Sequence, residues 1–363
     1  MCDFPMKGYR TTGRLVFTKP AGHSGAFIEV DCGQCLACKL KSRGEWTLRG
    51  RCEMQMQERA GRETWFLTVT YDDEHLPRDL NLSLREVQLF LMRLREHFGA
   101  GIRVQYCGEY GGQGLRPHYH FTLFGLNLDA SDLEIVGRSR MGPPMFTSEV
   151  VARLWGKGHV YLGRATPQSI GYVAGHQLKD LTEVYDAHGG YWLFDPLSGE
   201  LRERVAPFRH QSLKPGIGAS WFDKFWSDFF PRGYSYFDGV KVLPPAYFLR
   251  LLRRKDVAMW DAVMADREVL VSSDAYQADR TPRRLADRAI VRNARISHKR
   301  NARDEFSVGP NVLVRDLSGV PDGGFEVRER LSGRRRAMRE LRAAGIELPN
   351  GGVVFFDGSV SDE

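Results

Sequence analysis

The stretch RPHYHFTLFG, residues 116–125, decides the fold of this chain. Its aromatic and apolar residues predict a β-strand, in which successive side chains point to opposite faces of a sheet. His118 and His120 therefore share one face. Tyr119 and Phe121 lie on the other. Two neutral imidazoles on one face can hold a divalent cation between them. The other interpretation is a half-buried strand whose two histidines face solvent.

The preceding segment, IRVQYCGEY at residues 102–110, predicts a second strand, and the Gly-rich GGQGLRP joins the two strands as a hairpin. A symmetric loop places Glu109 opposite His118, with Cβ atoms about 5 Å apart. Two histidines and one carboxylate, with coordination positions left open, suit a catalytic Mg²⁺ or Mn²⁺ better than a closed structural site. The alternative for Glu109 is an edge carboxylate near Arg103 or Arg116.

A helix over residues 167–181 is predicted from Thr166 as N-cap, with a proline at the first helical position. At about 100° per residue, Tyr172, His176 and Lys179 form one stripe opposite an apolar one. A tyrosine acting on a phosphodiester is a nucleophile that forms a covalent intermediate, and a lysine stabilises phosphate charge. The alternative is an ordinary amphipathic surface helix.

Two further elements surround these motifs. TWFLTVTYDD at residues 64–73 predicts a central strand, and a helix begins at Ser83 with Glu86 in the capping-box position. We therefore expect an α+β fold with a central antiparallel β-sheet and packed helices on one face. The histidine pair would lie on an inner strand.

The motifs FLTVTYDD, CGEYG with RPHYHFTLFG, and GYVAGHQLK resemble the three ordered motifs of the HUH (His-hydrophobic-His) replication initiator endonucleases. The resemblance is to the microvirus (gokushovirus-type) replication initiation proteins in particular. CGQCLACK and SLKPGIGASWFDKFWSDFFP are similar to flanking segments of that family, so the resemblance covers residues 30–250 or so. It implies a phage rolling-circle initiator that nicks one strand at the origin. The products would be a 5′-phosphotyrosyl link and a free 3′-OH primer.

By position, the resemblance assigns the metal ligands His118, His120 and Glu109. It assigns Tyr172 as the nucleophile, and Lys179 matches a lysine of the tyrosine helix. His176 stands where these relatives typically carry a second tyrosine, and it is then an accessory catalytic group or a metal ligand. How the circle is resolved stays open between a second protomer, reuse of Tyr172 and a decayed prophage copy. The implied partners are single-stranded origin DNA and the host polymerase and helicase.

A cysteine cluster precedes these motifs. Cys32, Cys35 and Cys38 form C-x₂-C-x₂-C, and Cys52 or His23 is available as a fourth ligand. Zn²⁺ suits four such ligands. The sequence therefore predicts either a structural zinc site or thiols in a family-typical turn.

The composition bounds the class of protein. The chain has 363 residues, 42% hydrophobic and 27% charged, which is typical of a globular protein with room for about two domains. No apolar run approaches the roughly 18 residues that span a membrane, and the start lacks a signal-peptide core. Clustered cysteines indicate a reducing compartment, so we expect the bacterial host cytoplasm and no membrane partner.

The net charge of +7 favours a polyanionic partner. Residues 280–303 hold nine Lys or Arg and one Asp, and residues 328–342 form a second basic run. These runs either contact DNA or are solvated. We expect four parts: a cysteine-cluster segment 1–60, a nicking domain 61–190, an aromatic-, Gly- and Pro-rich extension 191–270 with short helices packed on the core, and a basic, partly disordered tail 271–363.

Other functions fit parts of the pattern. A plasmid relaxase or single-strand transposase uses the same chemistry, although relaxases normally carry three histidines in the metal motif. A non-catalytic DNA-binding protein on the same scaffold would bind DNA without a covalent adduct. A metal-dependent oxygenase or cupin-like barrel would need a distant third histidine strand, which the sequence does not present.

Overall fold

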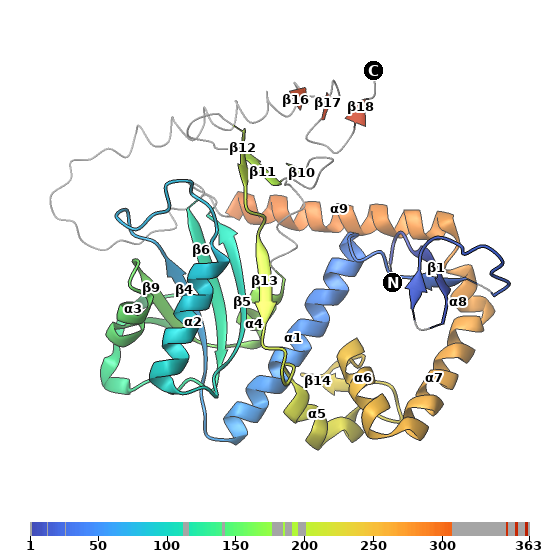
Figure 1. Ribbon diagram of the computed structural model, residues 1–363, viewed down its shortest axis with the longest axis horizontal. Coiled ribbons are helices and arrows are strands. Elements are labelled where there is room, and N and C mark those ends of the chain that lie inside the picture. The colour runs from blue at the N-terminus through green and yellow to red at the C-terminus, as the bar shows by residue number, and fades with distance from the viewer. Residues whose placement is uncertain are drawn as a thin grey trace. The chain divides into compact units, whose positions relative to one another are not determined.

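The computed structural model of the protein is shown in Figure 1. It describes residues 2–12, 14–25, 27–111, 116–139, 142–175, 184–185, 191–194, 201–306, 346–347, 353–354 and 360–361. The chain divides into two units, Met1–Arg295 and Ile296–Glu363, and each is described by itself.

A seven-stranded antiparallel sheet organises the first unit, in the order β13-β5-β6-β4-β9-β8-β7. Its three central strands are β5 (Arg103–Tyr110), β6 (Pro117–Phe124) and β4 (Thr64–Thr70). The outer strands are β13 (Phe208–Gln211), β9 (Val160–Arg164), β8 (Pro144–Ser148) and β7 (Leu133–Arg138). The predicted α+β fold with a central antiparallel sheet is confirmed, and the histidine strand β6 is an inner one.

One face of this sheet packs against α2 (Leu84–Phe98) and α3 (Glu149–Trp155). The shared core contains, among others, Trp65, Leu67, Phe90, Tyr119, Phe121 and Trp155. Ser83 is the N-cap of α2 as predicted, because its side chain accepts from the Glu86 N–H at 3.2 Å. The Glu86 carboxylate pairs with Lys157 at 3.4 Å.

The opposite face, which carries the two histidines, is covered by α1 (Leu36–Arg59) and α4 (Pro167–Ala174). We call it the histidine face. A smaller core of Phe124, Ile170 and Ile217 lies there, with Trp46 packed against it. The expectation of helices on one face is therefore wrong. Strands β4 to β6 are buried on both faces, which a single sequence cannot distinguish from burial on one.

The extension after residue 200 has its own core. It contains α5 (Ala219–Phe225), the 3₁₀ turn Trp226–Asp228, the hairpin β14 (Ser235–Phe237) and β15 (Val240–Val242), and the helices α6 (Ala246–Lys255) and α7 (Val257–Ser272). Trp221, Phe229 and Phe248 pack there with Leu48 and Cys52 of α1. Strand β13 also comes from this region, where the sequence predicted only irregular structure.

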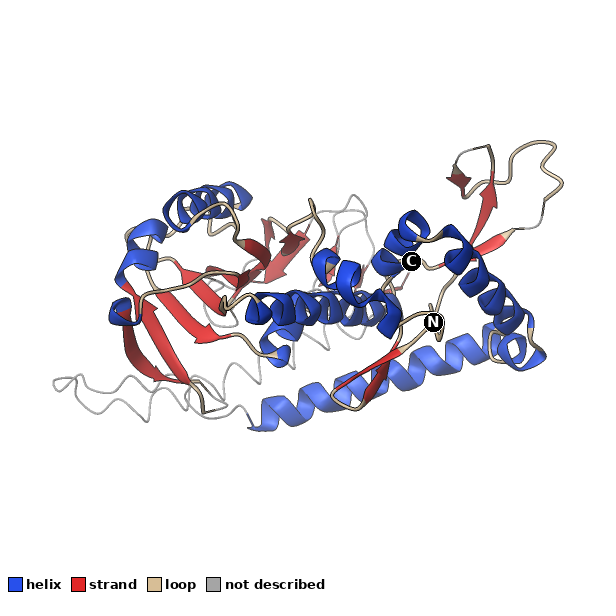
Figure 2. Cartoon of the chain, turned by 90° about the horizontal axis from the view of Figure 1, so that it is seen from below, coloured by secondary structure: helices blue, strands red, loops and turns tan. Residues whose placement is uncertain are grey.

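The remaining elements are short strands and basic helices. The N-terminal sheet is β2 (Leu15–Val16), β1 (Met6–Arg10) and β3 (Ile28–Val30), and a second small sheet is β10 (Val184–Tyr185), β11 (Tyr191–Phe194) and β12 (Leu201–Arg204). A 3₁₀ turn, Ala130–Asp132, precedes β7. Helices α8 (Asp274–Ala278) and α9 (Pro282–Phe306) carry the first basic run, and Figure 2 shows how largely helical the segment from α6 to α9 is.

In the second unit, β16 (Ile346–Glu347), β17 (Val353–Val354) and β18 (Val360–Ser361) pair with one another. The second basic run, residues 328–342, lies outside the described residues, as does most of the predicted disordered tail. Within the described part of the chain, no helix has the length and apolar character needed to cross a membrane.

Candidate active site on the histidine face

Strand register places three predicted ligands together. Glu109 of β5 pairs with His118 of β6, and Thr68 of β4 pairs with His120. Residues paired across an antiparallel ladder point to the same face. The predicted pairing of Glu109 with His118 is thus present, and both imidazoles lie on the histidine face.

The three side chains converge on one point. Nε2 of His118 lies 3.0 Å from Oε1 of Glu109, and Nε2 of His120 lies 2.8 Å from the same oxygen. The potential ligand atoms of all three lie within 4.8 Å of one another. Glu109 is 2% exposed and His120 is 8% exposed. This is a buried two-histidine, one-carboxylate group, the donor set that was predicted for a divalent cation.

The second nitrogen of each ring has its own partner. Nδ1 of His118 lies 3.2 Å from the carbonyl oxygen of Arg116, and Nδ1 of His120 lies 2.8 Å from Oγ1 of Thr68. A carbonyl oxygen only accepts, so a neutral His118 carries its proton on Nδ1 and keeps the Nε2 lone pair for a cation. Metal-binding histidines are oriented by such partners. The residues present therefore fit a divalent metal ion.

Tyr172 reaches this group from α4. Its hydroxyl donates to Oε1 of Glu109 at 2.6 Å and lies 3.5 Å from Nε2 of His120. The buried side of the helix carries Ile170 and Val173, both 0% exposed, while Tyr172 keeps 38% of its surface exposed. The predicted helical stripe thus brings the phenol to the histidines and leaves it open to solvent.

Close packing fixes α4 at this distance. An ideal Cβ on Gly50 of α1 would lie 2.5 Å from Cγ2 of Ile170, so a larger residue would push the two helices apart. Thr166 caps the start of α4 as predicted. At the other end, Arg209 of β13 donates to the carbonyl oxygen of Ala174 at 2.6 Å. Burial lowers the pKa of the Arg209 guanidinium from its ordinary value.

Two predicted members of the stripe, His176 and Lys179, lie outside the described residues, as does the rest of the helix predicted to residue 181. The described helix ends at Ala174, with Gly175 as its C-cap. Their roles stay predictions.

Two neighbours of the site were missed by sequence reasoning. Phe66 stacks on His120, with ring centroids 5.6 Å apart, and meets Tyr172 edge-on at 6.2 Å. Thr68 holds Nδ1 of His120. The alternation of the predicted strand FLTVT would have placed Phe66 and Thr68 on one face. Only the pairing of β4 with β6 shows that this is the histidine face.

The cysteines differ from the expectation. Sulfur atoms of Cys32, Cys35 and Cys38 lie within 4.8 Å of one another, but the fourth in this group is Cys2. Cys52 lies in the core beside Trp221 and is 0% exposed. His23 packs edge-on against Tyr9. The choice of Cys52 or His23 as the fourth member is therefore corrected to Cys2, which precedes Cys32 by a whole small sheet.

The thiols of this cluster have different acidities. Burial alone would raise the pKa of Cys32, but backbone N–H groups of Cys35 and Gln34 donate to its sulfur and lower the pKa to about 7. Burial raises the pKa of Cys2 and of Cys38. Backbone donors therefore favour a thiolate at one of the four positions.

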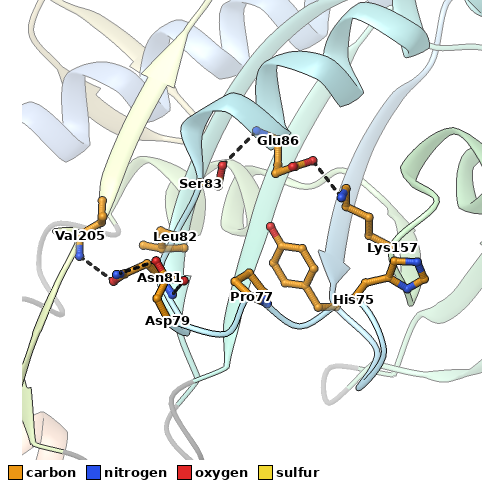
Figure 3. A pocket seen from close by; sticks show the side chains of 10 residues that line it. His75, Pro77, Asp79, Asn81, Leu82, Ser83, Glu86, Lys157 and Val205 are labelled. Carbon is orange, nitrogen blue, oxygen red and sulfur yellow. Dashed lines mark hydrogen bonds and ion pairs between the residues drawn. The ribbon is translucent and has the colours of Figure 1, made fainter.

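A separate hollow lies on the opposite face of the sheet, beside the start of α2 (Figure 3). Tyr71, His75, Asp79, Glu86 and Lys157 are among its lining residues, and Glu86 points toward Lys157. None of the described residues predicted for catalysis lines it. Its polar groups belong to the cap and ion pair that hold α2, so we assign the chemistry to the histidine face.

Comparisons with known proteins agree with the motifs. Residues 64–181 match the family of the replication-associated protein ORF2. Replication-associated protein VP4 of Bdellovibrio phage phiMH2K is 29% identical over 270 residues, which cover 71% of this chain and 79% of that protein. No solved structure gives a significant match.

Two further relatives cover less of their own length. Replication-associated protein ORF2 of Spiroplasma virus 4 is 34% identical over 160 residues, 42% of this chain and 48% of that protein. Replication-associated protein ORF4 of Chlamydia phage 1 is 25% identical over 260 residues, 70% of this chain and 58% of that protein. These matches confirm the resemblance to microvirus-type phage replication proteins.

Proposed function

We propose that this chain, a relative of microvirus-type phage replication-associated proteins, nicks one strand of the phage origin through Tyr172 and so starts rolling-circle replication. One observation carries the proposal. An exposed phenol lies 2.6 Å from a buried carboxylate that also accepts from two imidazoles. A core tyrosine would be covered, and a structural metal site would have no need of it.

The reaction follows from the side chains at the site. The Tyr172 oxygen attacks the phosphorus of a phosphodiester and forms a new P–O bond, while the bond from phosphorus to the 3′ oxygen breaks. The proton lost by the phenol balances the proton gained by the leaving 3′ oxygen. Glu109 accepts the hydrogen bond of the phenol and so orients it toward the open side.

The metal would be held by His118, His120 and Glu109. A divalent ion such as Mg²⁺ or Mn²⁺ supplies Lewis-acid polarisation of the scissile phosphate when bound. Thr68 and the Arg116 carbonyl keep the two rings turned toward it. Phe66 limits the movement of His120 by stacking on it.

Several parts of the proposal rest on the resemblance alone. Lys179 would stabilise phosphate charge, and His176 would bind metal or phosphate in place of a second tyrosine. The free 3′-OH needs a polymerase to extend it and a helicase to separate the strands, and we propose that the host supplies both. Residues 61–190 would be the nicking domain.

The test is incubation with labelled circular single-stranded phage DNA and Mg²⁺ or Mn²⁺. We expect a protease-sensitive protein–DNA adduct whose DNA maps to Tyr172 by peptide sequencing. Tight binding without any adduct would support the non-catalytic DNA-binding alternative. DNA on any other residue would contradict the assignment of the nucleophile.

A further inference from the structure

The N-terminal segment, residues 2–35, has no hydrophobic core of its own. Among its described residues only Cys2, Asp3 and Gly8 are buried. Its large apolar side chains face solvent, with Phe4 at 63% and Phe17 at 53% exposed. Three strands of two to five residues cannot hold a fixed sheet by apolar burial at this level. Another interaction must order this segment.

The cysteine cluster (Cys2, Cys32, Cys35 and Cys38) lies where the two ends of this segment meet. The sulfur of Cys2 is 3.8 Å from that of Cys35, and the sulfur of Cys32 is 4.0 Å from that of Cys38. These distances are about twice the 2.05 Å or so of a disulfide. Four thiolates around one Zn²⁺ at about 2.3 Å would have their sulfurs about 3.8 Å apart, the edge of the tetrahedron.

Backbone groups point at these sulfurs. The N–H of Cys32 donates to the sulfur of Cys2 at 3.3 Å, and the N–H of Asp3 donates to that of Cys35 at 3.4 Å. The N–H of Cys35 donates to the sulfur of Cys32 at 3.3 Å. Gly33, at φ 77°, makes the turn that allows this. Donors of this kind orient and stabilise thiolate ligands around a metal.

We propose that the cysteine cluster is a four-thiolate zinc site, completed by Cys2, which takes the place of a hydrophobic core in residues 2–35 and anchors helix α9. Tetrahedral sulfur coordination favours zinc among the divalent ions available to a cell. The site lies outside the nicking machinery, so it stands or falls independently of the proposed function.

The anchoring of α9 passes through Asp3. Its backbone N–H binds the sulfur of Cys35, while its carboxylate, 4% exposed, forms an ion pair with Arg292 of α9. A second ion pair joins Glu29 of β3 to Arg280, just before α9. Ordering of the cysteine cluster by zinc therefore fixes the acidic partners of two arginines in the basic run.

The first experiment measures zinc in the full chain, with any purification tag at the C-terminus. We expect one zinc per chain by elemental analysis, and Co²⁺ in its place should give the absorption of a tetrahedral thiolate site. Cys2→Ser should weaken zinc binding by more than the roughly 10–100-fold that outer-shell changes cause. Cys52→Ser is the matched control, because that thiol is buried in a different core.

Each other outcome is decisive. Absence of zinc and of competitive zinc uptake, or iron with labile sulfide instead, would overturn the site. Equal zinc loss in Cys52→Ser would overturn Cys2 as the fourth ligand. Because Cys2→Ser is at risk of misfolding, Cys38→Asp serves as a second variant that keeps a weaker ligand, and it should retain zinc at reduced affinity.

The second experiment is hydrogen exchange with and without a zinc chelator. We expect faster exchange in residues 2–38 and in 280–295, and unchanged exchange in β4 to β6, where the strand ladder holds the backbone. Faster exchange confined to residues 2–38 would overturn the anchoring of α9. Asp3→Asn should loosen α9 in the same way while zinc stays bound.

Discussion

The histidine face and the cysteine cluster bring potential metal ligands together in opposite ways. Glu109, His118 and His120 project from paired central strands and lie beneath a packed helix. The four cysteines lie among three short strands and the start of α1, in a segment without a core. In the first region the fold positions the ligands. In the second, we propose that the ligands and their metal hold the fold.

This difference has a physical basis in burial. The strands that carry the histidines are covered on both faces, so their register is fixed by apolar packing, whichever ion is bound. The cysteine cluster has little packing to lose, and binding free energy there becomes folding free energy. Substitutions on the histidine face should therefore change chemistry more than stability.

The largest expected effect is that of Tyr172→Phe, which keeps the ring and removes the attacking oxygen. We expect nicking and adduct formation to fall to background with DNA binding retained, measured with labelled single-stranded DNA. Tyr161→Phe is the control, since Tyr161 is equally exposed at 40% and pairs with Thr68 on the same face. An adduct that disappears only in the control would move the nucleophile to Tyr161.

Next in size is Glu109→Gln, which keeps the shape of the side chain and one acceptor but removes its charge. Metal polarisation supplies several kcal/mol in such sites, so we expect nicking to slow by at least about 100-fold. The thermal midpoint should change little, because strand register holds the site. A variant that does not fold would mean that the carboxylate organises the histidine face, and the contrast with the cysteine cluster would fail.

Thr68→Val should have a smaller effect. It removes the partner of His120 Nδ1, and removal of such outer-shell partners costs about 10–100-fold in metal affinity or activity. Raising the Mn²⁺ concentration should restore most of the nicking rate. Thr122→Val is the matched control on the same face, since the buried Thr122 hydroxyl makes no hydrogen bond to any of the described residues. Equal effects of the two substitutions would contradict a specific role for Thr68.

The smallest effect concerns the basic helix beside the cysteine cluster. Truncation after Arg295 should flatten the salt dependence of single-strand binding by about 0.7 in the log–log slope for each DNA phosphate that the shortened chain no longer neutralises. Arg292→Ala should leave that slope unchanged, because Arg292 already pairs with Asp3. An unchanged slope after truncation would show that residues 296–363 do not bind DNA.

The sequence by itself determined the parts of the site that depend on local periodicity. Alternation along a strand put His118 and His120 on one face, and hairpin symmetry paired Glu109 with His118. The helical period and the Thr166 cap aimed Tyr172 to the side opposite the apolar residues. These inferences succeed because backbone geometry fixes the direction of each side chain within one element or one tight hairpin.

Only the tertiary structure decided which elements meet. It covered both faces of the sheet, added β13 from a segment whose sequence is typical of irregular structure, and placed Thr68 and Phe66 against His120. It also brought Cys2 to Cys32 and left Cys52 in another core. Such pairs join residues tens of positions apart, where no local period links them. They depend on which arrangement buries the most apolar surface across the whole chain.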